Sequence, residues 1–379
     1  MACRLSHFSA TFVIAWTCFL SVACGLPGGS SGIVSPSASP VLPMRVASAS
    51  ARPITSSSYC PGLQPDHALL IESFGEVITQ AVVRDVQDPL HGVTLCLLPR
   101  GGAPRFMSAT AVALLDLGNF TRLDLTTGGQ TPVLTYVHND GPVVTEDWSP
   151  DGQTFAYGRL TPDNGAITFR LIAAGADRVL ATVPAPGLGV GSARIEFSPD
   201  GQLLALGAPA SALNGDGAAV QVRRLDGSLV FSAGGTGQQT WAGESPKLYF
   251  QGPAGVETWD ATHGAASLPI ARWQFPIRSA SGRWLAYLAP GRYSYELRLI
   301  DTRNGADRSL GNGEDAAWVT PTLLRFTDFL SCSTPIPGAE GPMSCVTRPV
   351  IYDTSDGSQT PTVAAHVFAS WPKSTPSWS

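Results

Sequence analysis

The sequence contains few charged residues and almost no lysine. Charged residues make up 14% of the 379 residues, and Lys247 and Lys373 are the only lysines. The formal net charge is −5, so the surface has no general electrostatic attraction for nucleic acid, and no nucleic-acid partner is expected. Glycine and proline are instead abundant, with 40 and 31 copies, which is typical of a turn-rich, all-β chain.

Recognisable catalytic and cofactor motifs are also missing. There is no P-loop, no His-Glu-x-x-His motif and no dinucleotide-binding fingerprint. A Gly-x-Ser-x-Gly pattern at residues 28–32 lies in a Ser/Gly/Pro-rich segment without the strand–turn–helix that a hydrolase nucleophile requires. The histidines beyond residue 60 have no metal-ligand spacing: His67, His91, His138, His263 and His366. No catalytic residue, metal ligand or cofactor is therefore predicted, and the sequence favours a non-enzymatic protein without deciding the matter.

The N-terminus has the pattern of an export signal. Arg4 precedes an apolar stretch over residues 8–23, which is too short for an ordinary membrane-spanning helix. Residues 20–24 read Leu-Ser-Val-Ala-Cys and resemble the processing box of a bacterial lipoprotein, although Ser21 stands where leucine is commoner. An ordinary cleavage site nearby is the alternative. We predict a signal peptide over residues 1–23 and a lipid anchor on Cys24, which would hold an extracytoplasmic protein on the bacterial cell membrane.

The remaining cysteines suit an oxidising compartment. Cys3 and Cys18 would leave with the signal, and with Cys24 lipidated an even set remains: Cys60, Cys96, Cys332 and Cys345. Of the three possible pairings we favour Cys60–Cys96, which would tie the entry of the chain to the first structural unit, and Cys332–Cys345, which closes a short loop. Residues 24–58 are dominated by Ser, Gly, Pro and Ala, so they predict a flexible stalk between the lipid and a folded domain over residues 59–379.

One short phrase recurs within residues 59–379. It reads Trp-Ser-Pro-Asp-Gly-Gln-Thr-Phe-Ala-Tyr from Trp148, Phe-Ser-Pro-Asp-Gly-Gln-Leu-Leu-Ala-Leu from Phe197, and Arg-Ser-Ala-Ser-Gly-Arg-Trp-Leu-Ala-Tyr from Arg278. Proline presets the first turn position and glycine takes a φ that other residues resist, so the phrase predicts a tight hairpin between antiparallel strands. A second strand–turn–strand pattern follows each copy, as at Thr168–Leu180 and Val220–Val230.

These patterns predict a repeat of about four short strands, close to the ~40–50-residue blade of a β-propeller. We predict an all-β propeller of about seven four-stranded antiparallel blades, and the irregular copies leave six to eight open. Residues 366–371 are expected to complete the sheet of the first blade, because an open ring would leave an unpaired strand edge. Trp148, Trp241 and Trp318 recur at the blade period and are expected to pack between blades.

The Trp/Phe-Ser-Pro-Asp-Gly phrase, followed by an apolar-Ala-apolar strand, resembles the repeat of TolB-like β-propellers. The resemblance covers most of residues 59–379, and two copies match the motif fully. It implies protein–protein contact in the bacterial envelope without fixing a partner. The helical N-terminal domain that accompanies the propeller in TolB has no counterpart here.

The candidate binding surface is the face of the propeller that carries the longer loops. Hairpins between strands one–two and three–four share one face, whereas the other face has the strand two–three loops and the links between blades. We call this second face the long-loop face, and its longest loops are expected at residues 160–167, 208–219, 289–296 and 330–348. Long loops on a rigid scaffold often carry binding residues. The candidate contacts are Asp163, Asn164, Asn214, Asp216, Arg292, Tyr293 and Tyr295, with the Cys332–Cys345 loop as a rigid finger, and plain solvated turns are the alternative for each.

Two functions remain open at this point. The first is a tethered scaffold that binds an envelope protein or peptide on the long-loop face. The second is a propeller that binds or hydrolyses glycan in a central polar pocket, for which the residues near predicted inner strands are Glu146, Asp147, Arg194, Glu196 and Arg278. Two carboxylates about 5–9.5 Å apart beside arginines would favour a glycosidase.

Overall fold

The structure is a computed structural model that describes residues 60–74, 81–86, 92–99, 104–116, 119–135, 141–163, 165–184, 193–208, 220–243, 246–290, 295–332, 345–362 and 365–373. The predicted signal peptide, Cys24 and the stalk lie outside these described residues. All described strands fall within one compact unit, Arg52–Ser379. Among the described residues, no helix is long and apolar enough to cross a membrane.

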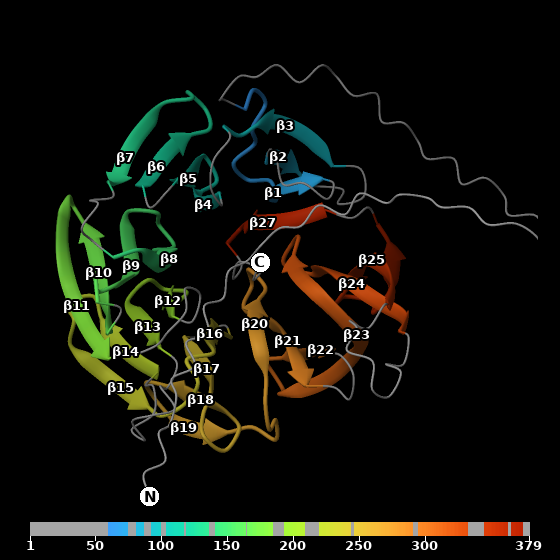
Figure 1. The fold of residues 1–379 in the computed structure, drawn as a ribbon. Coiled ribbons are helices and arrows are strands. Elements are labelled where there is room, and N and C mark those ends of the chain that lie inside the picture. Colours follow the sequence, from blue (N-terminus) through green and yellow to red (C-terminus); the bar gives the residue numbers. More distant parts are fainter. Residues whose placement is uncertain are drawn as a thin grey trace, which may run out of the picture. The chain divides into compact units, whose positions relative to one another are not determined.

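Five four-stranded antiparallel sheets follow one another around a centre (Figure 1). Blade 1 has the order β27 (Ala365–Trp371), β1 (Leu69–Phe74), β2 (Val82–Asp85) and β3 (Val93–Leu97). Blade 2 contains β4 (Arg105–Ser108), β5 (Ala111–Asp116), β6 (Asn119–Asp124) and β7 (Gln130–Leu134). Blade 3 contains β8 (Val143–Trp148), β9 (Thr154–Leu160), β10 (Ala166–Ala173) and β11 (Ala176–Pro184). Blade 4 contains β12 (Arg194–Phe197), β13 (Leu203–Gly207), β14 (Val220–Arg224) and β15 (Leu229–Ala233), and blade 5 contains β16 (Gln239–Ala242), β17 (Lys247–Gln251), β18 (Val256–Asp260) and β19 (Gly264–Ser267).

The last seven strands form two blades that share one long strand. They are β20 (Gln274–Arg278), β21 (Trp284–Pro290), β22 (Tyr295–Asp301), β23 (Ala306–Trp318), β24 (Leu323–Cys332), β25 (Cys345–Asp353) and β26 (Gln359–Pro361). The first half of β23 pairs with β22 up to Asn312, and the second half pairs with β24 from Gly313 onward. Strand β23 is therefore the outer strand of blade 6 and the inner strand of blade 7, which confirms the prediction of an all-β propeller with about seven blades.

The C-terminal strand closes the ring. β27 pairs antiparallel with β1, from Leu69 opposite Trp371 to Phe74 opposite Ala365. The expectation that residues 366–371 complete the first blade is confirmed.

The recurring phrase folds as the predicted hairpin. In blade 3, Ser149 N donates to Thr154 O at 2.9 Å, Asp151 Oδ1 accepts from Gln153 N at 3.0 Å, and Gly152 has φ 68°. The blade 4 copy repeats this geometry: Asp200 Oδ1 accepts from Gln202 N at 3.1 Å. The turn is therefore fixed by its own side chains.

Tryptophans at the blade period lie in the core between neighbouring blades. Trp148, Trp241 and Trp318 are all at most 4% exposed. Trp241 Nε1 donates to Glu196 O at 3.0 Å, and Trp318 Nε1 donates to Ile277 O at 3.3 Å. Both bonds run from one inner strand to the inner strand of the preceding blade, so these indoles fix the spacing of the blades as well as filling the core.

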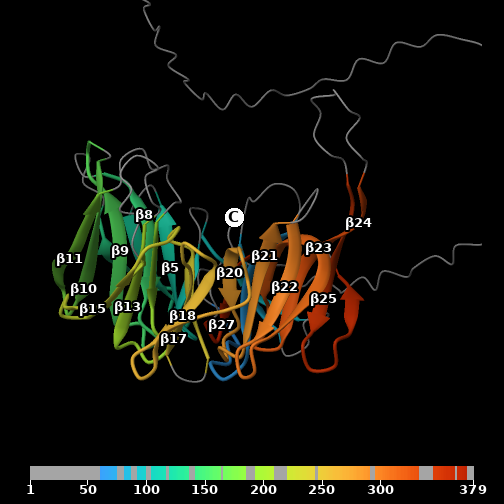
Figure 2. The ribbon, with the colours of Figure 1, turned by 90° about the horizontal axis from the view of Figure 1, so that it is seen from below.

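Two disulfides join the cysteine pairs that the sequence favoured. Cys60 is bonded to Cys96 and Cys332 to Cys345. The β24–β25 ladder continues to Cys332 opposite Cys345, so both ends of the loop expected at residues 330–348 are strand. These strand ends extend past the neighbouring strands of blade 6 (Figure 2).

Candidate functional site

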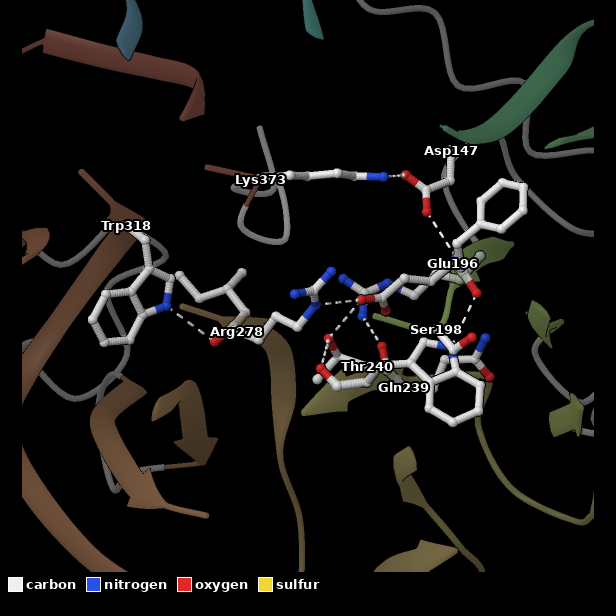
Figure 3. Close-up of polar contacts among 12 residues, drawn as sticks. Asp147, Glu196, Ser198, Gln239, Thr240, Arg278, Trp318 and Lys373 are labelled. Carbon is white, nitrogen blue, oxygen red and sulfur yellow. Dashed lines mark hydrogen bonds and ion pairs between the residues drawn. The ribbon is translucent and has the colours of Figure 1, made fainter. Parts of the chain in front are cut away.

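Polar side chains from the inner strands of several blades form a cluster at the centre of the ring (Figure 3). Glu196 on β12 accepts from Arg278 Nε on β20 at 3.2 Å and from Thr240 Oγ1 on β16 at 3.1 Å. Glu196 and Arg278 are both less than 10% exposed. This ion pair therefore connects blade 4 to blade 6 across the inner edge of blade 5.

Asp147 connects blade 3 to blade 4 and to the end of the chain. Its Oδ2 accepts from Phe197 N at 2.8 Å, and its Oδ1 accepts from Lys373 Nζ at 2.5 Å. Lys373 also donates to Trp148 O at 2.5 Å. Both carboxylate oxygens of Asp147 are thus occupied by donors of the protein itself.

Burial shifts the pKa of several groups in this cluster. Desolvation raises the pKa of Glu196, and Arg278 opposes that shift. Desolvation likewise raises the pKa of Glu146, with Arg105 opposing. Burial lowers the pKa of Arg194, whose Nη1 donates to Gln239 O. Each charge is held in place by an opposite charge or a fixed acceptor, as buried charges require.

The structure thus brings together the central residues that the sequence nominated for glycan chemistry: Glu146, Asp147, Arg194, Glu196 and Arg278. Asp147 and Glu196 do not have the arrangement of a glycosidase pair, because intramolecular donors already hold both carboxylates. A general acid or nucleophile needs its carboxyl group facing the substrate. This cluster instead connects the inner strands of blades 3 to 6.

A cavity of about 950 Å³ lies elsewhere, on the long-loop face. Three connections line it: the link from β15 to β16 (residues 232–238), the β17–β18 loop (residues 251–253) and the segment entering β20 (residues 272–275). The first and third join successive blades, and the second joins strands two and three of blade 5. The volume lies in the range of ligand pockets in proteins.

Two glutamines hold the walls of this cavity together. The Gln251 amide donates to Gly252 O at 3.0 Å and to Ala271 O at 3.3 Å, and its Oε1 accepts from Trp273 N at 3.0 Å. Gln238 Oε1 accepts from Phe275 N at 3.2 Å. The loops of blades 4, 5 and 6 are therefore cross-linked by hydrogen bonds, and the cavity is preformed.

Phe275 is placed in the cavity wall by an unusual backbone conformation. Its φ is 49°, in the left-handed region that bulky residues rarely adopt, and the β20–β21 register shifts between Gln274 and Ile277. The residue is 38% exposed. Non-glycine residues in this conformation cost free energy and often mark functional sites.

Two of the candidate contacts from the sequence, Asp163 and Tyr295, are described, and neither is among the residues that line this cavity. Asp163 lies in an exposed turn in which its Oδ1 accepts from Thr161 Oγ1 and Gly165 N, and these bonds lower its pKa. Tyr295, at the start of β22, is 39% exposed. The other five lie outside the described residues: Asn164, Asn214, Asp216, Arg292 and Tyr293.

Sequence reasoning missed Gln238, Gln251, Arg272 and Phe275 because it selected loops by length. The connections that form the cavity are short and rich in glycine. The signal available in the sequence was Arg-Trp-Gln-Phe from Arg272, two aromatic residues and a cation at the start of an inner strand. No group of three or more His, Cys, Asp or Glu side chains within the described ranges is arranged to hold a metal ion.

No protein-family model matches this sequence, and no curated protein matches it. Solved structures do show similar chain arrangements. Hydrazine synthase of Kuenenia stuttgartiensis is 13% identical, with a TM-score of 0.43 over 66% of this chain and 76% of that one. TolB from Acinetobacter baumannii is 14% identical, with a TM-score of 0.41 over 79% and 81%. The propeller domain of the trilobed protease from Pyrococcus furiosus is 10% identical, with a TM-score of 0.45 over 69% and 84%. No function is transferred from these structures.

Proposed function

We propose that this protein is a non-catalytic, extracytoplasmic scaffold that is lipid-anchored through Cys24 and binds a protein or peptide on its long-loop face. The observation that carries the proposal is the preformed cavity between blades 4, 5 and 6 on that face. A rigid wall with an exposed aromatic side chain suits a binding partner, because little conformational entropy is lost on association. The two disulfides favour an oxidising compartment.

Membrane tethering is tested by replacing the predicted lipidated cysteine. Wild-type chain expressed in a bacterium should incorporate labelled fatty acid and sediment with membranes. Cys24→Ala should lose the label and appear in the soluble extracytoplasmic fraction. A labelled Cys24→Ala chain, or an unlabelled wild-type chain, would remove the anchor from the proposal.

Partner binding is tested with a photo-crosslinking amino acid placed on either face. Phe275 lies in the cavity, and Leu229 is 52% exposed on the opposite face, at the tight β14–β15 hairpin. The probe at position 275 should crosslink an envelope protein or peptide, and the probe at position 229 should not. Equal crosslinking from both positions would place binding elsewhere.

Glycan binding or hydrolysis is the second candidate, and one observation favours it. Glu146 is half-buried and desolvation raises its pKa, as in a general acid. Incubation with cell-wall fragments and analysis of the products distinguishes the two functions. Shortened glycans that disappear with Glu146→Gln would establish the second function and overturn the first.

A further inference from the structure

The cavity on the long-loop face has a charge opposite to that of the whole protein. Among the described residues that line it, Arg272 is the one charged residue, and the Glu257 carboxylate lies next to Gly252 of the lining. The chain as a whole carries a formal net charge of −5. Arg272 is exposed and makes no ion pair within the described residues. Its guanidinium is therefore available for a carboxylate of another molecule.

The segment that carries Arg272 is held rigidly. The neighbouring Trp273 is 2% exposed, and its ring centroid lies 6.5 Å from that of Tyr249 and 5.9 Å from that of Tyr287. The Trp273 backbone is further fixed by its hydrogen bond to Gln251. Arg272 and Phe275 thus sit near a buried anchor, and their backbone is ordered before any ligand arrives.

The cavity also has an apolar surface and a free amide. Phe275 is 38% exposed and Pro253 contributes to the wall. The Gln238 side chain uses its oxygen to hold Phe275 N, and its amide nitrogen has no partner among the described residues. A free N–H donor beside an aromatic ring can pair with a peptide carbonyl while an apolar side chain packs on the ring.

We propose that this cavity binds an acidic peptide segment in which a carboxylate contacts Arg272 and a neighbouring apolar side chain packs on Phe275. The proposal rests on the proposed scaffold function and adds the chemistry of its partner. The combination of one cation, one exposed aromatic residue and one amide donor is complementary to a peptide with alternating acidic and apolar residues. Arginine and aromatic residues are also the side chains that most often dominate binding energy at interfaces.

The test measures the affinity of three fluorescein-labelled hexapeptides for the purified full chain by fluorescence anisotropy. The peptides are Ala-Asp-Phe-Glu-Leu-Ala, its amide analogue with Asn and Gln, and its basic analogue with two Lys. The acidic peptide should bind about tenfold more tightly than the amide analogue, and added salt should narrow the difference.

Variants then assign the contacts. Arg272→Gln should lower the affinity for the acidic peptide by about tenfold and leave the affinity for the amide analogue unchanged. Arg224→Gln, at an exposed arginine in the tight β14–β15 hairpin of the opposite face, is the matched control and should change neither peptide. Phe275→Ala should lower the affinity for the acidic peptide and for the amide analogue by the same factor.

Equal binding of the acidic and amide peptides, or of the acidic peptide to wild-type and Arg272→Gln, would overturn the inference. If the probe at position 275 still crosslinks a partner in that case, the proposed scaffold function is retained and the proposal of an acidic ligand is wrong. If no peptide binds and the probe at position 275 crosslinks nothing, the scaffold function and the acidic-peptide proposal are both wrong. If trigalacturonate binds in an Arg272-dependent manner and the peptides do not, the ligand is an acidic glycan and the peptide proposal is wrong.

Discussion

Glu72 on β1 and Arg325 on β24 form an ion pair with an Nη1–Oε2 distance of 3.2 Å, which joins the first blade to the seventh. The other oxygen of Glu72 accepts from Arg84 on β2. The Glu72 side chain is completely buried. Two interactions therefore close the ring: the pairing of β27 with β1, and a buried carboxylate that contacts arginines of both blades.

Removing this carboxylate should strongly destabilise the propeller. Glu72→Gln removes the buried negative charge that both Arg84 and Arg325 contact, and losing one partner of a buried pair costs about 3–5 kcal/mol. Chemical denaturation followed by tryptophan fluorescence measures the loss. Arg348→Gln is the control, because the Arg348–Asp328 pair has a side chain 42% exposed and should contribute less than about 1 kcal/mol. Similar losses from both variants would contradict the role given to Glu72.

The two disulfides should contribute unequally to stability. Cys60 and Cys96 are 3% and 4% exposed in the core cluster between blades 1 and 2, and they are 36 residues apart in sequence. Cys332 and Cys345 are 13 residues apart at the projecting ends of β24 and β25. From loop length alone the expected contributions are about 4 and about 3 kcal/mol. Because the first pair is also core, Cys60→Ala with Cys96→Ala should lower the melting temperature more than Cys332→Ser with Cys345→Ser. The reverse order would contradict this.

The repeat was readable from the sequence because its information is local. Proline, aspartate and glycine fix the turn after Trp148 or Phe197 through contacts within five residues, and the structure has that turn. The strand that closes the ring was also predictable, since a propeller with a free edge is unfavourable. The long β23 was not, because Gly311, Asn312 and Gly313 at the boundary between its halves are residues typical of a turn, whereas one uninterrupted strand runs through them and serves two blades.

The cavity was not predictable because it depends on contacts between distant segments. Gln251 holds Trp273, and Gln238 holds Phe275, across 22 and 37 residues. No short pattern specifies such pairings. The central charges were found because they lie on predicted inner strands, but their pairing depends on the ring: Lys373 reaches Asp147 across 226 residues. The sequence could identify these groups as candidates, but it could not show that they bind one another.

High pH should destabilise the fold partly through Tyr157. Its hydroxyl donates to Asp177 Oδ2 at 2.9 Å, and burial together with this bond raises its pKa to about 12 from the ordinary 10.0. The unfolded chain loses the proton near the ordinary pKa and the folded chain only near the raised one. This contribution to stability is therefore fully present below about pH 10 and is lost as the pH rises toward about 12. Denaturation midpoints measured across this interval should fall more gradually in Tyr157→Phe than in wild type.

Tyr249 offers a second check on this interpretation. Burial raises the pKa of its hydroxyl to about 12 as well. In Tyr249→Phe the denaturation midpoint should therefore also fall less steeply with pH above about 10. The double variant should be flatter than either single one. A wild-type slope retained in all three variants would show that other groups control alkaline unfolding.

Two glycines in left-handed turns should respond differently to the same substitution. Gly152, in the recurring phrase of blade 3, has φ 68°, and an added Cβ would lie 2.6 Å from Met107 O in blade 2. Gly175, in the β10–β11 hairpin, has φ 77° and nothing within 4 Å of that position. Gly175→Ala should therefore cost only the backbone strain, about 1–2 kcal/mol. Gly152→Ala carries the same strain and must also push the backbone of blade 2 away, which adds about 1–3 kcal/mol.

Denaturant midpoints of the two variants measure this difference in stability. Equal losses of stability would show that the turn at Gly152 does not press against the neighbouring blade. A larger loss at Gly152 would mean that glycine is required in the phrase for the close approach of two blades as well as for the turn itself.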